Sequence, residues 1–503
     1  MFPVKSTTYG HKKDDPVAKL KQFEDALPTP MIDEIKCGSF GAFGIDNSVS
    51  DLLKEVGFAH GVARLGCSKR SGRDIPVLIM LMILRPLLHV NSIFMFCRGH
   101  YLSVFNTGKD AFYRILQHPV PWRSIHWSLV KRLVPLWRQK DVGEGYLVAD
   151  TTVVAKRGKE IEGACWHHDH TTGRSTAGFE TTQLVWINNA GCLVLDAALR
   201  LSKKPLIADL SDRLGARFDG RSLLGKRVKE SADHTKLDHT LAMVKRAVDA
   251  GIPAKYFLAD AWFDSLGFLS DVRELGLIPL VRMKRGNTKF WYDNKEYDVK
   301  ELWAGFAKAK TRKVIRSLKF KGTHLDVFHP ELGLVRLFFM HLIDPAKGSK
   351  EWAVFITTDT SMAISAMVEH YANRFGIEVF YKESKQYLGF MKESVRSFEA
   401  VTACLHIAAM RHAVLSSLAV LKGVKREEIS NDIAALSYAQ KLWNVFRLLI
   451  AKAIHGIENI GSDVKEQILE TVNQAVDTWL RSALLMDVSG SRRQILAESN
   501  CES

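Results

Sequence analysis

The chain has 503 residues, of which 47% are hydrophobic and 25% are charged. This balance is typical of a globular protein and excludes wholesale disorder and fibrous repeats, and the length predicts about two to four domains. Lysine and arginine number 70 against 55 acidic residues, a net charge of +15. That excess favours a polyanionic partner, most often nucleic acid, over a basic surface kept only for solubility.

The cysteines and the apolar segments bear on the cellular compartment. The seven cysteines lie far apart and include no CxxC pair, which favours a reducing compartment over a disulfide framework. The N-terminal segment lacks the apolar core of a signal peptide. The most apolar stretch, Ile75–Leu84, is too short for a bilayer, which needs about 20 residues. We therefore expect a cytoplasmic protein with no membrane partner.

Residues 1–142 form the first predicted region. Apolar residues recur at helical spacing from Asp74 to about Leu136, with a break at His118–Trp122. The basic residues of this region suit DNA contact and a solvated helical face equally well. It is therefore a helical region and a candidate DNA-binding domain.

The second region, residues 143–283, alternates strands and helices. Runs rich in β-forming residues predict strands, and helical spacing predicts crossover helices between the later ones. The expected strands are Tyr146–Val154, Gly178–Ile187, Cys192–Leu201, Tyr256–Ala261 and Leu277–Met283, and the expected helices are His234–Ala250 and Asp264–Gly276. The order β-β-β-α-β-α-β predicts an α/β core with a mixed sheet.

Residues 284–349 are predicted to form a basic, β-rich insertion. The short β-like runs are Lys313–Phe320, Leu325–Phe328 and Gly333–Leu342. Across 281–350, 16 basic and 7 acidic residues leave a net charge of +9 (16 − 7).

The core is expected to resume at 350–422. This part contains a strand at Lys350–Thr358, a long helix from Ser361 to about Leu388, and a further helix at 395–422. Residues 423–503 are expected to form a helical C-terminal region, at 435–455 and 463–486, and are a candidate for dimerisation.

Two predicted strands end alike, in LVAD at Asp150 and in FLAD at Asp260. Asp is depleted in strands, and neighbouring strands lie about 4.8 Å apart, so two such carboxylates are able to share divalent ions. Each Asp alone is explained more simply as the start of a turn or a helix cap. The repeated ending favours function, and oxygen ligands suit Mg²⁺ or Mn²⁺.

The long predicted helix carries a third carboxylate. At about 100° per residue, Tyr371, Arg374, Glu378 and Lys385 project within an arc of about 60°. Such a face suits a metal-bound phosphate, with Glu378 on the metal and the two cations on phosphate oxygens. The alternative is a solvated helix side on which Arg374 and Glu378 form an i,i+4 pair.

The run Tyr371-x2-Arg374-x3-Glu378-x6-Lys385 resembles the YREK signature of bacterial insertion-sequence transposases of the insertion sequence 4 type. These are DDE transposases with a ribonuclease-H-like core. The segments LVADTT and FLADAWFD resemble the strands that carry the family's two Asp residues, and the basic segment resembles its β-rich insertion. The similarity covers about residues 140–420.

The resemblance implies that Asp150, Asp260 and Glu378 are the catalytic residues and bind two Mg²⁺ ions, for which Mn²⁺ can substitute. One ion would activate water, and later the 3′-hydroxyl, and the other would stabilise the leaving oxygen.

The resemblance also implies DNA contacts. Tyr371, Arg374 and Lys385 would hold the transposon end, and Trp352 would stack a base flipped out of the duplex, unless Trp352 is an ordinary core residue. Phe375 stands where some relatives have Trp, so a second aromatic contact does not carry over.

The implied function is that of a transposase that binds the terminal inverted repeats of an insertion sequence. It would cleave the DNA ends through hairpins and join the 3′-hydroxyls to target DNA, acting as a homodimer on double-stranded DNA and associating with the nucleoid. Two alternatives remain: a catalytically silent, transposase-derived DNA-binding protein, and a ribonuclease-H-like nuclease that only hydrolyses.

Two further features have competing interpretations. The run Cys165–His170 has zinc-ligand residue types, but no second cluster completes a site, so DNA-backbone contact or a structured turn is favoured. Asp264 is a rival for the second metal ligand, although its place before a helical stretch favours helix capping. Lys156 and its basic neighbours suit DNA contact or a solvated loop equally.

Overall fold

The computed structural model describes residues 47–67, 72–88, 90, 92–98, 108–158, 160–169, 173–201, 223–308, 313–315, 320–342, 352–430, 449–450, 452–454, 456 and 461–471. The chain divides into two compact units, of which the larger comprises 49–93 and 109–429. The elements that bear on function lie in this larger unit. Most of the predicted C-terminal helices at 435–455 and 463–486 lies outside the described residues.

A mixed sheet forms the core of the larger unit. Within the described ranges its strand order is β2-β3-β1-β5-β6-β12-β11-β10-β7-β8, with β4 paired to β3 and β9 to β10. The strands are β1 (Gly145–Ala155), β2 (Cys165–Asp169), β3 (Arg174–Asn188), β4 (Gly191–Arg200), β5 (Ala254–Ala259), β6 (Ile278–Met283), β7 (Lys289–Tyr292), β8 (Lys295–Asp298), β9 (Lys313–Ile315), β10 (Phe320–His329), β11 (Gly333–Leu342) and β12 (Trp352–Thr357). Strand β1 is antiparallel to β3 and parallel to β5, and β6 is parallel to β5 and antiparallel to β12.

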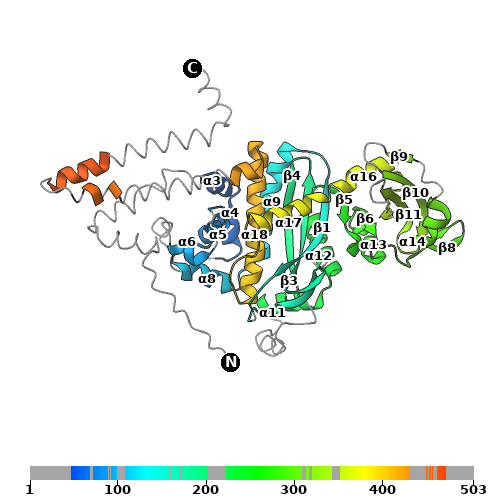
Figure 1. Cartoon of the computed structure of the whole chain (residues 1–503), viewed down its shortest axis with the longest axis horizontal. Helices are drawn as coiled ribbons and strands as arrows, with labels where there is room; N and C mark the ends of the chain where they lie inside the picture. Colours follow the sequence, from blue (N-terminus) through cyan, green and yellow to red (C-terminus); the bar gives the residue numbers. More distant parts are fainter. Residues whose placement is uncertain are drawn as a thin grey trace, which may run out of the picture. The chain divides into compact units, whose positions relative to one another are not determined.

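Helices cover the sheet, as Figure 1 shows for α9, α17 and α18. The helical elements are α3 (Asn47–Glu55), α4 (Phe58–Arg64), α5 (Ile75–Leu84), α8 (Lys109–Gln117), α9 (Trp122–Lys140), α11 (Leu223–Asp233), α12 (Lys236–Asp249), η2 (Ala261–Phe263), α13 (Leu266–Glu274), α14 (Val299–Leu302), η3 (Trp303–Ala307), α16 (Ile364–Ala372), α17 (Phe375–Gln386) and α18 (Phe398–Lys422). Strands β3 and β4 are buried along almost their whole paired length, as expected for strands covered on both faces.

Helix α18 is the most buried helix of this core. It has the length and apolar composition of a membrane span, but 89% of its most apolar window is buried inside the protein. Ser397 caps its N-terminus by accepting from Ala400 N, and Gly423 ends it in the left-handed conformation. Helix α18 packs on β4 and α9, so its apolar composition is explained by the core.

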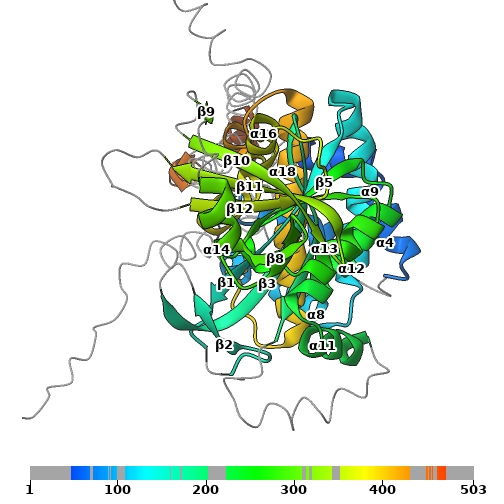
Figure 2. The ribbon, with the colours of Figure 1, turned by 90° about the vertical axis from the view of Figure 1, so that its right-hand side faces the viewer.

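The predicted strands of the core are confirmed as β1, β3, β4, β5 and β6, and the α/β class with a mixed sheet is confirmed as well. Strand β2 and helix α11 were not predicted. In the basic segment, β10 and β11 coincide with predicted runs and continue the sheet from β12, side by side in Figure 2. Strands β7 and β8, helix α14 and the π-helical turn η3 were not predicted there.

The single long helix predicted from Ser361 to Leu388 is wrong, because the chain forms two helices, α16 and α17. At the junction the amides of Asn373, Arg374 and Gly376 bond three residues back, and the Asn373 side chain donates to the carbonyl oxygen of Glu369 at 3.0 Å. A Cβ on Gly376 would lie 2.5 Å from Cδ1 of Ile187 on β3, so a larger residue here would require the Ile187 side chain to move. The chain therefore changes direction at 373–376, where the first turn of α17 packs against β3.

Candidate functional site

The two predicted strand carboxylates lie side by side. Val148 of β1 is in register with Leu258 of β5, and because the strands are parallel, Asp150 and Asp260 follow at the same level. Burial raises the pKa of Asp150 to about 6, the charge of Asp260 adds to the rise, and Arg374 opposes it. Asp150 therefore lies in a poorly solvated place where the charge of Asp260 also disfavours its ionised form.

Glu378 joins them from the first turn of α17. Arg374, at the N-cap of that helix, places Nη1 3.4 Å from Asp150 Oδ2 and bonds Glu378 Oε1 through Nη2. One guanidinium thus bridges a strand carboxylate and the helix carboxylate. The i,i+4 pair weighed as an alternative is present, and it is also part of the cluster.

The other two signature residues hold the same strands. The Tyr371 hydroxyl donates to the carbonyl oxygen of Ala259 at 3.2 Å, immediately before Asp260, and burial raises the pKa of Tyr371 to about 12. Lys385 Nζ lies 2.5 Å from Thr152 Oγ1 on β1. Arg374 and Lys385 therefore contact the middle of β1, Tyr371 contacts the end of β5, and Glu378 is joined to Asp150 through Arg374.

Trp352 lies two strands away from Asp260 along the sheet, because β6 separates β12 from β5. Continued by one residue, the register puts Asp260 level with Phe355, three residues from Trp352. Trp352 is therefore offset from Asp260 by about 10 Å across the strands and by about another 10 Å along β12. The Trp303 ring stacks on Trp352 with centroids 4.9 Å apart and an interplanar angle of 15°, and Arg285 Cζ lies 5.6 Å from the Trp352 ring centroid. The structure thus covers one face of Trp352 with another indole.

Comparison with known families agrees with this geometry. Residues 102–305 match the family model described as DDE superfamily endonuclease, and this range contains Asp150 and Asp260. Residues 217–412 match the model described as transposase DDE domain, and this range contains Asp260 and Glu378. The chain is a DDE transposase. No curated protein matches the sequence. Domains of this kind act on DNA and use divalent metal ions.

In this transposase, Asp260 and Asp264 have separate tasks. Asp260 also caps η2 by accepting from Trp262 N at 2.9 Å, so capping and membership of the cluster coexist. The helix-capping role expected of Asp264 is wrong. Its carboxylate accepts from Lys284 N at 2.7 Å and from Lys284 Nζ at 3.2 Å, which holds the end of β6, and Ser265 occupies the N-cap of α13.

The metal-like run at 165–170 is mostly strand β2. Side chains alternate along a strand, so Cys165 and His167 are buried while Trp166 and His168 are exposed. His170 lies outside the described residues. In the described part of the run, the residues therefore point to opposite sides and do not form one metal site.

Tyr381, which was not predicted as a site residue, supports Asp150. The Tyr381 hydroxyl lies 2.8 Å from the carbonyl oxygen of Asp150 and also contacts Gln183 Oε1 of β3. Tyr381 follows Glu378 by three residues, so the helical spacing was a usable signal. Tyr381 fixes α17 to β1 at the level of the carboxylates.

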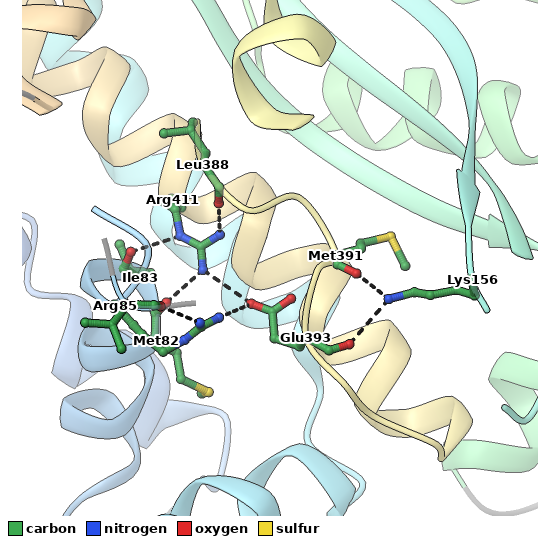
Figure 3. A network of polar contacts seen from close by, with 9 residues as sticks. Met82, Ile83, Arg85, Lys156, Leu388, Met391, Glu393 and Arg411 are labelled. Carbon is green, nitrogen blue, oxygen red and sulfur yellow. Dashed lines mark hydrogen bonds and ion pairs between the residues drawn. The ribbon is translucent and has the colours of Figure 1, made fainter. Parts of the chain in front are cut away.

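A cavity of about 1060 Å³ opens beside Lys385, between β1 and the segment 390–396. Lys156 was expected to contact DNA or lie in a solvated loop. Instead it is partly buried and donates to the carbonyl oxygens of Met391 and Glu393, as Figure 3 shows. Exposed Arg157, Lys392 and Arg396 also line the cavity. Basic side chains outnumber acidic ones in its wall, and Lys385, which lines it, also bonds Thr152, two residues after Asp150.

Proposed function

We propose that this DDE transposase cleaves DNA at the terminal inverted repeats of an insertion sequence and joins the 3′-hydroxyls to target DNA. In this proposal Asp150, Asp260 and Glu378 are the metal ligands on a ribonuclease-H-like core. The observation that supports it most is the Arg374 guanidinium, which contacts Asp150 and Glu378 together while Asp260 lies one strand away. Membership of the insertion sequence 4 type rests on the YREK spacing.

The cluster fits divalent ions chemically. It offers carboxylate oxygens, which suit Mg²⁺ and Mn²⁺. Burial and the neighbouring charge of Asp260 raise the pKa of Asp150, and Arg374 opposes the rise only in part. When bound, a pair of such ions activates the attacking oxygen and stabilises the leaving oxygen. We infer Mg²⁺ as the cofactor, with Mn²⁺ as a substitute.

The signature cations have a second task in this proposal. A planar guanidinium binds phosphate oxygens in a fork, and an ammonium binds them as a point charge. Arg374 and Lys385 would hold the DNA backbone next to the carboxylates, with Tyr371 beside them. The basic cavity beyond Lys385 extends this surface along β1.

We expect Lys385→Ala to weaken binding of transposon-end DNA and to flatten the slope of log K against log salt by about 1. The reason is the loss of one phosphate contact and the counterion that it releases. Filter binding or fluorescence anisotropy over a salt series measures it. Lys245→Ala, an exposed lysine of α12, is the matched control and should keep the slope. An unchanged slope in Lys385→Ala removes Lys385 from the DNA surface.

Strand transfer distinguishes the three candidate activities. The full chain is incubated with Mg²⁺, target DNA and labelled ends made from the inverted repeats that flank its gene. Joined products are expected. A silent DNA-binding protein would give none and would leave the ends intact, and a nuclease would cut the ends without joining them. The same complexes, sized in solution, test the proposed homodimer.

Trp352→Ala is expected to accumulate nicked ends and to slow hairpin formation by about tenfold to a hundredfold. Stacking of an extruded base on an aromatic ring is worth about 1–3 kcal/mol, and first-strand nicking does not need the extruded base. A denaturing gel of end-labelled DNA shows both species. Because Trp303 covers one face of Trp352, the base would take the other face or displace Trp303.

Two variants test the role of Trp352. Trp303→Ala removes the stacking neighbour, and Phe375→Ala removes a ring that is 63% exposed at the start of α17. If Trp352→Ala and Trp303→Ala lower stability alike and hairpins form at the wild-type rate, Trp352 is a core residue. A selective hairpin defect in Phe375→Ala would assign the base to Phe375 instead.

A further inference from the structure

Two histidines and a glutamate converge where α11 meets α12, on elements separate from the carboxylate cluster. The side chains are Glu230, in the last turn of α11, His234, just after that helix, and His239, in the first turns of α12. Each offers one ligand atom, and these atoms lie within 4.8 Å of one another. Among the described residues, no other three His, Cys, Asp or Glu side chains place their ligand atoms this close together. The carboxylates of Asp150, Asp260 and Glu378 are spread further apart, and Arg374 contacts two of them.

The corner between the helices holds these residues in place. Thr235 and Asp238 form a capping box, in which Asp238 N donates to Thr235 Oγ1 at 3.2 Å and Thr235 N donates to Asp238 Oδ2 at 2.8 Å. The turn between α11 and α12 is therefore fixed by side chains within it. It brings the rings of His234 and His239 to a centroid distance of 5.3 Å.

His239 is the member that most needs a partner. It is 2% exposed, and its Nε2 is buried without a hydrogen-bond partner among the described residues, which is rare for a buried polar atom. Burial lowers the pKa of His239 to about 4, which Glu230 opposes and Arg123 reinforces. The imidazole is thus neutral at neutral pH, the form that binds metals.

Arg123 is the group that competes for the glutamate. Its Nη1 lies 2.8 Å from Glu230 Oε1, and its Nε lies 3.6 Å from Asp196 Oδ1. If a cation bound Glu230, Arg123 would lose that partner but would keep the buried carboxylate of Asp196 as its counter-charge. Asp238 also lies close enough to interact electrostatically with both histidines, so acidic groups offset the positive charge around the corner.

We propose that Glu230, His234 and His239 bind a transition-metal ion of the zinc type, which ties α11 to α12. Two imidazole nitrogens and one carboxylate oxygen are a zinc donor set, whereas Mg²⁺ prefers oxygen ligands alone. His234 is exposed, so water is able to complete a tetrahedral shell. This site differs in donor chemistry from the all-carboxylate cluster.

Zinc binding by the full-length protein tests the site. After chelator treatment, the protein is titrated with Zn²⁺ in excess Mg²⁺, and bound zinc is counted. Wild type is expected to bind one equivalent more than His234→Ala, whose affinity at this site should fall by at least about 100-fold. Zinc should also raise the thermal midpoint of wild type and not that of His234→Ala, because a ligand of the folded state stabilises it.

The matched control is His60→Ala, which removes an exposed histidine of α4 and should bind zinc as wild type does. His234 is used for the test because His239 is buried, and its loss risks the fold. Equal zinc stoichiometry and equal thermal shifts in wild type and His234→Ala overturn the proposal and place any bound zinc elsewhere. A loss of zinc in His60→Ala overturns it as well.

Discussion

Asp150→Asn, Asp260→Asn and Glu378→Gln should each lower Mg²⁺-dependent DNA cleavage by at least about 1000-fold while leaving DNA binding largely intact. Metal-borne charge stabilisation is worth several kcal/mol in the transition state, and about 1.4 kcal/mol is a factor of ten in rate. Cleavage of labelled ends, beside a band-shift assay on the same preparations, measures both quantities. The amide variants keep the volume of the side chain, so a lost ligand is the main change.

Asp271→Asn is the matched control, since Asp271 is exposed on α13 and should keep wild-type cleavage. Near-normal cleavage by any of the three variants would exclude that residue from the metal site. Loss of cleavage together with loss of folding would leave catalysis unassigned for that variant, so circular dichroism accompanies each measurement.

The raised pKa of Asp150 predicts how its substitution affects stability. Its folded-state pKa is raised to about 6, first by burial and then by Asp260, so its ionised form is disfavoured in the metal-free protein. Because the unfolded chain ionises this carboxyl more easily, Asp150 lowers the free energy of unfolding of the metal-free protein as the pH rises from the ordinary Asp range to about 6. Above about pH 6 the penalty is fully present, and it disappears as the pH falls back through that range. Asp150→Asn should therefore be at least as stable as wild type at neutral pH.

The strands and the carboxylates could be predicted because both signals are local. Short apolar runs bounded by turns mark β1 and β5, and each run carries its Asp at the same place, so parallel pairing brings Asp150 beside Asp260. Glu378 was singled out by helical spacing on one predicted helix, which the structure divides into α16 and α17. Arg374 was harder, because phosphate binding and an i,i+4 pair with Glu378 were weighed as alternatives, and a contact with Asp150 was not expected. One guanidinium makes both contacts.

What the sequence did not reveal depends on contacts between distant segments. The break between α16 and α17 lies where Gly376 packs against Ile187 of β3, a contact that no local pattern encodes. Asp264 stands before a helix, yet it bonds Lys284, 20 residues on. Strand β2 was missed because its polar residues suggested ligands, although it pairs with the N-terminal half of β3.

A buried charge cluster of Arg85, Glu393 and Arg411 likewise joins segments that lie far apart in the sequence (Figure 3). Glu393 Oε1 lies 2.6 Å from Arg85 Nη2 and 3.7 Å from Arg411 Nη2, and all three side chains are at most 8% exposed. Arg411 also donates to the carbonyl oxygens of Met82, Ile83 and Leu388. Burial lowers the pKa of Arg411 to about 10, so it remains charged at neutral pH.

Glu393→Gln should lower the free energy of unfolding by about 3–5 kcal/mol, because it leaves two buried guanidiniums without the counter-charge that they share. Urea denaturation at neutral pH measures the change. Glu160→Gln is the matched control: Glu160 pairs with Arg396 at 3.1 Å, but their side chains are 75% and 81% exposed, so its loss should cost less than about 1 kcal/mol. Equal stability of the two variants would show that Glu393 does not hold this segment.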